Sequence, residues 1–361
     1  MVMICDRLIE VGLILILIYT PLAFGAVTEY STMLFEMAIG GLLLVWLIKM
    51  FSQRKKAPRD GSWQPGKHYL RFVNPPVFIP LCVFFIFLIF QRILLPGSLV
   101  KIISPNTYHL YAEAARITSV TIPPWLPLSV CAQSTETEFL KFLTYVAVFF
   151  IIINNIRRPE QVKRLVYAII AVGFSESLYG LLQLLSGKQF LSFYPKAFLI
   201  SGSFINKNHF AGYMEMVILL TFGVIFTRFE KPRSSHQGDS EPIEEKYAKT
   251  SLSLFLVLIM ISAHLLSGSR GGIISLAGGI IFFAILVNIR HLLRQWIIVL
   301  LIFLPLVLVL MVMMVPDQIS RNFSRFTGEQ FDLSFQTRWE IWRTQGHIFQ
   351  DFPAVGSGFG T

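Results

Sequence analysis

The sequence predicts an all-α protein, a polytopic bundle of about nine transmembrane helices. Hydrophobic residues make up 54% of the 361 positions and charged residues 14%, and the mean hydropathy is +0.62. A soluble globular protein holds about 25% charged residues. The apolar residues gather in segments close to the roughly 20 residues that a membrane-spanning helix needs. Lysines and arginines gather in the stretches between these segments.

Each predicted span is an apolar segment of suitable length for a helix that crosses a bilayer. The first segment lacks a clear small-residue cleavage site and is closely followed by the second, so we interpret it as a retained helix and not as a signal peptide. The predicted spans are residues 8–24, 33–49, 77–95, 139–156, 165–185, 210–227, 251–266, 273–289 and 296–315.

The distribution of lysine and arginine predicts the orientation of the chain. With the amino terminus inside, the inside stretches hold more than half of the 31 lysines and arginines. Because cationic loops stay inside, we predict an inside amino terminus. The predicted inside stretches are residues 1–7, 49–75, 154–164, 228–249 and 290–294, and the outside stretches are residues 96–137, 186–209, 267–272 and 316–361. The prediction therefore has a helical bundle over residues 1–315 and a large outside loop that begins at residue 316.

Composition also limits the binding partners. The net charge is +10, but this charge follows membrane topology and no nucleic-acid motif is present, so no nucleic-acid partner is predicted. The three cysteines imply neither a disulfide framework nor a metal site. No nucleotide-binding glycine motif and no metal-ligand spacing occurs, so no cofactor and no metal are predicted.

The turn at residues 267–272 places Arg270 between two apolar segments. A cation beside a bilayer core is costly and is a candidate functional residue. The neighbouring Ser269 and Gly271 are small and let backbone N–H groups and the guanidinium approach an anion closely. The alternative is an arginine that only anchors a helix end at the interface.

Two further outside segments carry candidate binding residues. Lys207, Asn208 and His209 precede or begin the predicted span at residue 210, where Asn208 is expected to cap the helix and the first turn favours an anion. Arg338 and Arg343 lie near Trp339 and Trp342, and on a helix these residues would share adjacent faces. Ordinary loop capping and a helix lying on the membrane surface are the alternative interpretations.

Three titratable residues lie within or beside the spans. Glu176 and Glu215 are expected to face the bundle interior, each paired with a cation or a hydroxyl group, and a role as general base stays open for either. His264 lies one helical turn before the Arg270 turn. It is either a packing residue or a member of the same cavity.

Several motifs resemble the O-antigen ligase and O-antigen polymerase family of bacterial inner-membrane proteins. They are residues 202–212 (Gly-Ser-Phe-Ile-Asn-Lys-Asn-His-Phe-Ala-Gly), residues 267–272 (Ser-Gly-Ser-Arg-Gly-Gly), residues 337–342 (Thr-Arg-Trp-Glu-Ile-Trp) and residues 351–360 (Asp-Phe-Pro-Ala-Val-Gly-Ser-Gly-Phe-Gly). Residues 127–130 (Pro-Leu-Ser-Val) and Thr135 are similar as well. The resemblance covers the chain from about residue 120 onward.

The resemblance implies a metal-independent glycosyltransferase of polysaccharide or lipopolysaccharide biosynthesis, with its amino terminus in the cytoplasm. The donor would be a glycan on undecaprenyl diphosphate at the periplasmic face, and the acceptor would be lipid A-core, another glycan or a protein. Arg270 and Arg338 would hold the diphosphate. The further candidate substrate-binding residues, taken from the motifs themselves, are Lys207, Asn208, His209, Ser269, Gly271 and Arg343. Arginine suits this role because its planar fork binds phosphate oxygens in pairs.

One departure from the family pattern leads to a further expectation. Family members continue past residue 361 with more periplasmic loop, a functional histidine and further helices, so the chain is expected to be truncated. Held at one end only, the residues after about residue 316 are expected to be loosely fixed. A transporter or flippase of lipid-linked glycans and an inactive family member are the alternative functions.

Overall fold

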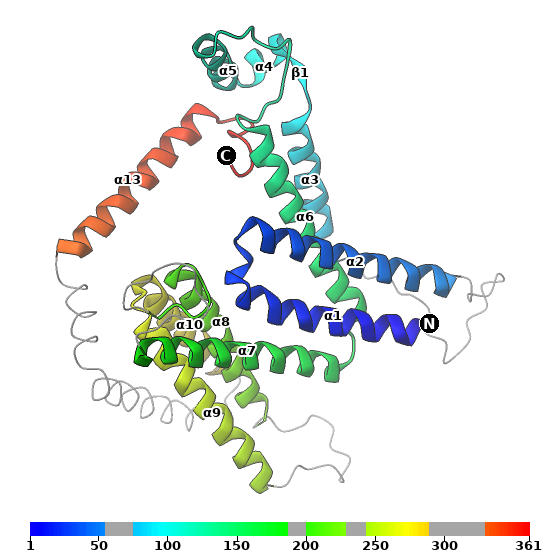
Figure 1. Ribbon diagram of the computed structural model, residues 1–361, viewed down its shortest axis with the longest axis vertical. Helices are drawn as coiled ribbons and strands as arrows, with labels where there is room; N and C mark the ends of the chain where they lie inside the picture. The colour runs from blue at the N-terminus through cyan, green and yellow to red at the C-terminus, as the bar shows by residue number, and fades with distance from the viewer. Residues whose placement is uncertain (55–74, 187–199, 229–242, 289–328) are drawn as a thin grey trace. The chain divides into compact units, whose positions relative to one another are not determined.

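The computed structural model describes residues 1–54, 75–186, 200–228, 243–288 and 329–361. In these ranges it contains eleven α-helices, one short 3-10 helix (η1, Phe24–Ala26) and one two-stranded sheet (Figure 1). The predicted all-α class is therefore confirmed for the described residues.

A helix covers each predicted apolar segment within the described residues. Four of these helices, α2, α7, α8 and α9, are long and apolar enough to cross a membrane, and α3 and α10 are shorter apolar helices. The ninth segment, residues 296–315, lies outside the described residues, so the number of spans stays a prediction. The helices are α1 (Val2–Leu22), α2 (Glu29–Arg54), α3 (Phe78–Arg92), α6 (Ala132–Asn155), α7 (Pro159–Ser186), α8 (Lys207–Thr227), α9 (Ile243–Leu266) and α10 (Arg270–Asn288).

The chain divides into two compact units, each of which is described by itself below. Unit 1 consists of Met1–Ile9, Glu36–Ile156 and Glu329–Thr361, and unit 2 consists of Glu10–Phe35 and Arg157–Gly328. The predicted domain boundary at residues 315–316 falls in a range that the structure does not describe.

Helices α7, α8, α9 and α10 pack together in unit 2. Their core is formed by large apolar side chains such as Phe210, Met214 and Met260, all fully buried. Gly173 of α7 lies so close to α8 that an added Cβ would be 2.7 Å from Val217 Cγ1. Small residues at such contacts let membrane helices approach closely, which is how they gain packing energy in lipid.

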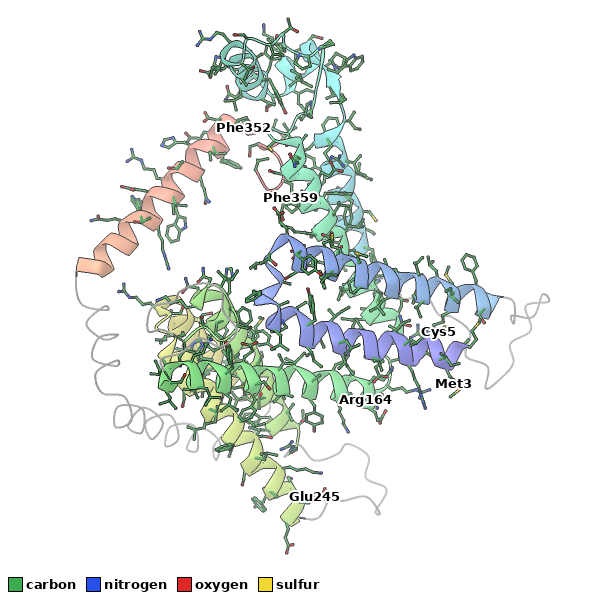
Figure 2. All side chains as sticks on the ribbon, in the orientation of Figure 1. Met3, Cys5, Arg164, Glu245, Phe352 and Phe359 are labelled. Atoms are coloured by element: carbon green, nitrogen blue, oxygen red, sulfur yellow. The ribbon has the colours of Figure 1, made fainter. Side chains whose placement is uncertain are left out.

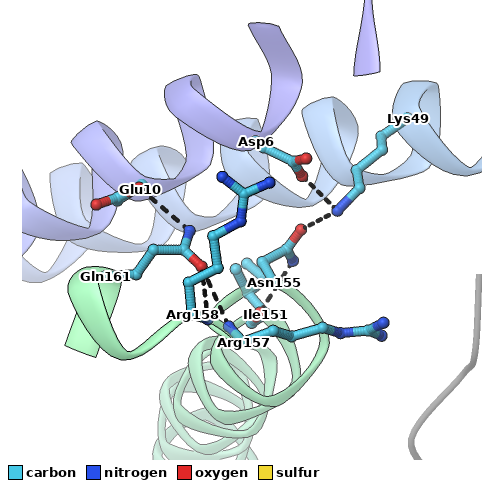
Figure 3. Close-up of polar contacts among 8 residues, drawn as sticks. All are labelled: Asp6, Glu10, Lys49, Ile151, Asn155, Arg157, Arg158 and Gln161. Carbon is cyan, nitrogen blue, oxygen red and sulfur yellow. Dashed lines mark hydrogen bonds and ion pairs between the residues drawn. The ribbon is translucent and has the colours of Figure 1, made fainter. Parts of the chain in front are cut away.

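The first turn of α7 is fixed by a glutamine that uses both ends of its amide (Figure 3). Gln161 Oε1 accepts hydrogen bonds from the backbone N–H groups of Arg157 (3.2 Å) and Arg158 (3.1 Å), and Nε2 donates to Glu10 Oε2 (3.1 Å). Arg164 forms an ion pair with the same Glu10 carboxylate. A side chain in the third helical position that reaches back to free N–H groups is half of a capping box.

In unit 1, α3 packs against α6. A buried lysine joins further elements of this unit, because Lys49 Nζ lies 2.5 Å from Asp6 Oδ1 and 2.7 Å from Asn155 Oδ1 (Figure 3). Asp6 is on α1, Lys49 on α2 and Asn155 on α6. The buried ammonium group of Lys49 therefore has two oxygen partners, as burial in an apolar bundle requires.

Residues 95–126 form a small folded cap on unit 1, where the sequence predicted only an outside segment. The cap holds α4 (Gly97–Ile103), α5 (Pro105–Ile117), and strand β1 (Leu95–Pro96) paired antiparallel with β2 (Trp125–Leu126). Proline at the start of α5 fits because the first helical N–H has no intrahelical partner. The buried core of the cap is Val100, Leu126, Leu128 and Val355.

Residues 355–359 contact other parts of unit 1, so the expectation of a loosely fixed chain end is wrong for these residues, and for residues 316–354 it stays a prediction. After α13 (Glu329–Asp351), Gln91 Nε2 donates to the carbonyl of Val355 (2.6 Å), and Val130 N–H donates to the carbonyl of Ser357 (2.7 Å). The ring centroid of Phe359, which is labelled in Figure 2, lies 5.6 Å from that of Phe84 and 6.1 Å from that of Phe142. The prediction failed because it considered only the covalent tether and not contacts with the amino-terminal half.

Candidate anion site at two helix starts

The turn between α9 and α10 is built by its glycine and serines. Gly268 has a φ of +63°, the left-handed conformation that commonly ends a helix, and Ser267 and Ser269 are buried on either side. Ser269 Oγ accepts a hydrogen bond from Gly272 N–H (3.2 Å), as an N-cap residue does. Arg270 is therefore the first residue of α10 and not part of the turn itself.

The start of α8 is capped by Asn206, so the prediction that Asn208 caps this helix is wrong. The Asn206 side chain accepts a hydrogen bond from Asn208 N–H (2.8 Å), and α8 begins at Lys207, three residues before the predicted span. Both asparagines are suitable caps by residue type, and the extended backbone at Asn206 decides between them.

Two hydrogen bonds join the starts of α8 and α10. Lys207 Nζ donates to the carbonyl of Gly268 (3.0 Å), and Ser269 Oγ donates to Asn208 Oδ1 (2.8 Å). Gly272 supports this close approach, because an added Cβ would lie 2.7 Å from Ala211 Cβ. The structure thus brings together two segments that are 61 residues apart in the sequence.

The paired helix starts have the electrostatics of an anion site. The first N–H groups of an α-helix have no intrahelical partners, and the helix dipole adds partial positive charge there. Two cationic side chains stand at the first helical positions, Lys207 of α8 and Arg270 of α10, and both are half-buried. Such a pair is suited to phosphate or carboxylate oxygens.

The exposed fractions of the side chains distinguish residues at the surface of the two helix starts from residues that hold the helix starts together. Asn208, His209 and Gly271 are exposed, whereas Ser269 is 2% exposed and its hydroxyl is engaged with Asn208 and Gly272. We therefore place Ser269 in the frame of the site. Lys207, Asn208, His209, Arg270 and Gly271 line the surface where an anion would bind.

The three other titratable candidates have different surroundings. His264 is fully buried beneath the turn, where an added Cβ on Gly272 would lie 3.1 Å from its Cε1. Glu176 contacts a serine hydroxyl, which confirms the predicted hydroxyl partner. Glu215 Oε2 is buried and has no hydrogen-bond partner among the described residues, so its predicted pairing is not found there.

Arg338 and Arg343 lie on α13, which confirms the predicted helix around them. Both arginines are exposed, as are Trp339 and Trp342. These residues belong to unit 1, whereas residues 207–209 and 269–271 belong to unit 2. Within the described ranges, no group of three His, Cys, Asp or Glu side chains is placed to hold a metal ion.

A comparison with protein families matches the carboxy-terminal part of the chain. The family model described as O-Antigen ligase matches residues 255–361. This part of the chain is similar to the O-antigen ligase family. No curated protein and no solved structure matches the chain.

The match includes the turn before α10, Arg270, and all of α13 with Arg338 and Arg343. It confirms the family resemblance and supports a function of the ligase or polymerase type. Residues 207–209 precede the matched range, and hydrogen bonds connect them to it.

Two residues that position the candidate motifs were missed in the sequence. Asn206 was overlooked because Asn208 is an equally good cap by type. Gln91 is 3% exposed and holds residues 355 and 359 through both ends of its amide. The sequence does place a polar amide near the end of the apolar helix α3. Because a buried amide needs hydrogen-bond partners, its position was a signal that Gln91 binds another part of the chain.

Proposed function

We propose that this protein is an O-antigen ligase-like glycosyltransferase that takes its glycan from a polyprenyl diphosphate. The observation that carries the proposal is the cationic surface at the joined starts of α8 and α10, within and beside the family match. In this proposal Arg270 binds the diphosphate, Lys207, His209 and Gly271 contact it, and Asn208 and Ser269 hold the two helix starts together. Arg338 and Arg343 of α13 belong to the other unit, and their part in diphosphate binding is proposed from the family resemblance and not from the structure.

The proposed reaction depends on stabilising a leaving group. An acceptor hydroxyl oxygen forms a bond to the anomeric carbon of the sugar. The bond between that carbon and the diphosphate oxygen breaks, the electron pair stays on the diphosphate, and the hydroxyl proton is released. Fixed cations and helix N-terminal N–H groups stabilise the charge that develops on the diphosphate. Arg270 is suited to this because a guanidinium stays charged and binds two oxygens at once.

The proposed location is the bacterial inner membrane, with the amino terminus in the cytoplasm and the site at the periplasmic face. The support is the clustering of lysine and arginine in the predicted inside stretches. A reporter that is active only in the periplasm, fused after Gly272, is expected to be active, and one fused after Lys246 is expected to be silent. The reverse pattern would contradict the orientation and the location of the site.

The test of the function is deletion of the gene in the organism that makes this protein. We expect the glycan to disappear from its lipid A-core, glycan or protein acceptor, and the lipid-linked donor to accumulate at the periplasmic face. A reagent that modifies glycans but cannot cross the membrane detects the donor at that face. Accumulation on the cytoplasmic face would instead indicate a flippase, and an unchanged acceptor glycan would contradict both functions.

A further inference from the structure

A fully buried carboxyl group lies beside the loop that leads into α8. Glu176 is on α7, is 1% exposed, and meets Ser203 twice. Ser203 N–H donates to Glu176 Oε2 (2.8 Å), and Ser203 Oγ lies 2.7 Å from Glu176 Oε1. Ser203 Oγ also lies 2.7 Å from the carbonyl oxygen of Pro21 on α1. Through Ser203, this carboxyl group connects α7, the loop and the end of α1.

Hydrogen-bond accounting limits how these groups can be arranged. The Ser203 hydroxyl lies between two oxygen atoms, 2.7 Å from both Glu176 Oε1 and the Pro21 carbonyl oxygen, and its single hydrogen is donated to one of them at a time. The second carboxyl oxygen of Glu176 accepts from Ser203 N–H. Glu176 therefore holds Ser203 through both its backbone and its side chain, and such hydrogen bonds are strengthened in a low-dielectric interior.

The backbone around Ser203 is shaped to this carboxyl group. Gly202 has a φ of +55°, and an added Cβ would collide with Glu176 Oε2 and lie 3.1 Å from the ring of Phe210. Gly180, one turn further along α7, would meet Ile200 Cγ2 at 2.5 Å if it carried a Cβ. Glycines at these two positions let the loop lie directly on α7, so that the carboxyl group reaches the Ser203 backbone.

We propose that Glu176 is a positioning residue for the anion site, and that its carboxyl group acts by holding Ser203 and not as a catalytic base. Ser203 is three residues before Asn206, the cap of α8, and Lys207 follows at once. Fixing Ser203 therefore fixes the position from which α8 starts. Only the claim that this region binds an anion rests on the proposed function. The anchoring itself stands on the contacts of Glu176.

The test compares Glu176→Gln with Glu176→Ala. A glutamine amide donates to Ser203 Oγ and accepts from Ser203 N–H, so it keeps both contacts with Ser203. Alanine loses both contacts. Loop anchoring is read from an Ile205→Cys protein without its three native cysteines, as the rate of labelling by a water-soluble maleimide. We expect labelling about thirtyfold faster with alanine, since two hydrogen bonds near 1 kcal/mol each are lost, and an unchanged rate with glutamine.

Glycan transfer in the natural host supplies the second readout. Transfer is expected to fall about tenfold or more with alanine and to stay near the natural rate with glutamine. Glu160→Ala, which changes an exposed glutamate on the same helix, is the matched control and is expected to alter neither readout. Loss of transfer with glutamine at an unchanged labelling rate would show that a carboxylate is required and would overturn the inference.

The labelling rate separates failure of this inference from failure of the proposed function, because it needs no glycan. If alanine leaves the labelling rate unchanged, the anchoring is refuted whatever the activity. If labelling behaves as expected in a protein with no glycan transfer, the anchoring stands and the proposed function is refuted.

Discussion

Replacing Arg270 by lysine is expected to slow glycan transfer about a hundredfold, although the charge is kept. In the proposed site the guanidinium binds two diphosphate oxygens with its planar fork, whereas the ammonium of lysine is a single point charge. Losing charge-assisted hydrogen bonds that form in the transition state costs about 3 kcal/mol, and every 1.36 kcal/mol is a factor of ten in rate. Replacement of Arg270 by alanine is expected to slow glycan transfer further.

The measurement is the amount of glycan on the acceptor when the substitution is made in the chromosome of the natural host. Arg228→Lys is the matched control, because Arg228 follows the opposite end of α8, where Nη1 donates to Ser253 Oγ (3.0 Å). It is expected to leave transfer close to its natural rate. Normal transfer by Arg270→Ala at normal protein level would exclude a catalytic role for Arg270.

Alanine substitution is expected to destabilise the protein at one of two adjacent glycines, Gly272, and not at the other, Gly271. An alanine at residue 272 places its Cβ 2.7 Å from Ala211 and 3.1 Å from His264, so α10 must move away from α8. Overpacking of this kind costs about 1–3 kcal/mol. At residue 271 an added Cβ meets nothing within 4 Å, and removing a glycine from a helix is neutral or favourable by up to about 1 kcal/mol.

Unfolding by SDS in mixed micelles measures both effects. We expect a clear destabilisation for Gly272→Ala and none for Gly271→Ala. Because Lys207 and Asn208 contact residues 268 and 269, Gly272→Ala is also expected to weaken anion binding. Equal stability of the two variants would contradict the close contact between the starts of α8 and α10.

The helices were predictable from sequence because apolar segments near 20 residues long have few other folds open to them. The helix over Arg338 and Trp342 was predictable for a different reason, since their spacing suits two faces of one helix. What could not be predicted is where polar side chains find their partners. The choice of Asn206 over Asn208 depends on backbone conformation, which the residue types alone do not determine.

Long-range contacts were also beyond the sequence argument. The Arg270 turn and the start of α8 were each recognised as candidate anion sites, but their connection depends on Lys207 reaching Gly268 and Ser269 reaching Asn208. The anchoring of residues 355–359 by Gln91 involves partners 264 and 268 residues away. No local pattern carries that information, because such contacts are set by the packing of the whole unit.

The most direct test of the proposed site is the affinity of the purified chain, in lipid nanodiscs, for polyprenyl diphosphate, polyprenyl phosphate and polyprenol. The paired helix starts and their cations predict that affinity falls in this order, because each step removes charge that the site binds. Arg270→Lys is expected to weaken binding of the diphosphate about tenfold and to leave binding of polyprenol unchanged. Equal affinity for diphosphate and polyprenol, or full diphosphate affinity in a folded Arg270→Ala protein, would contradict the account.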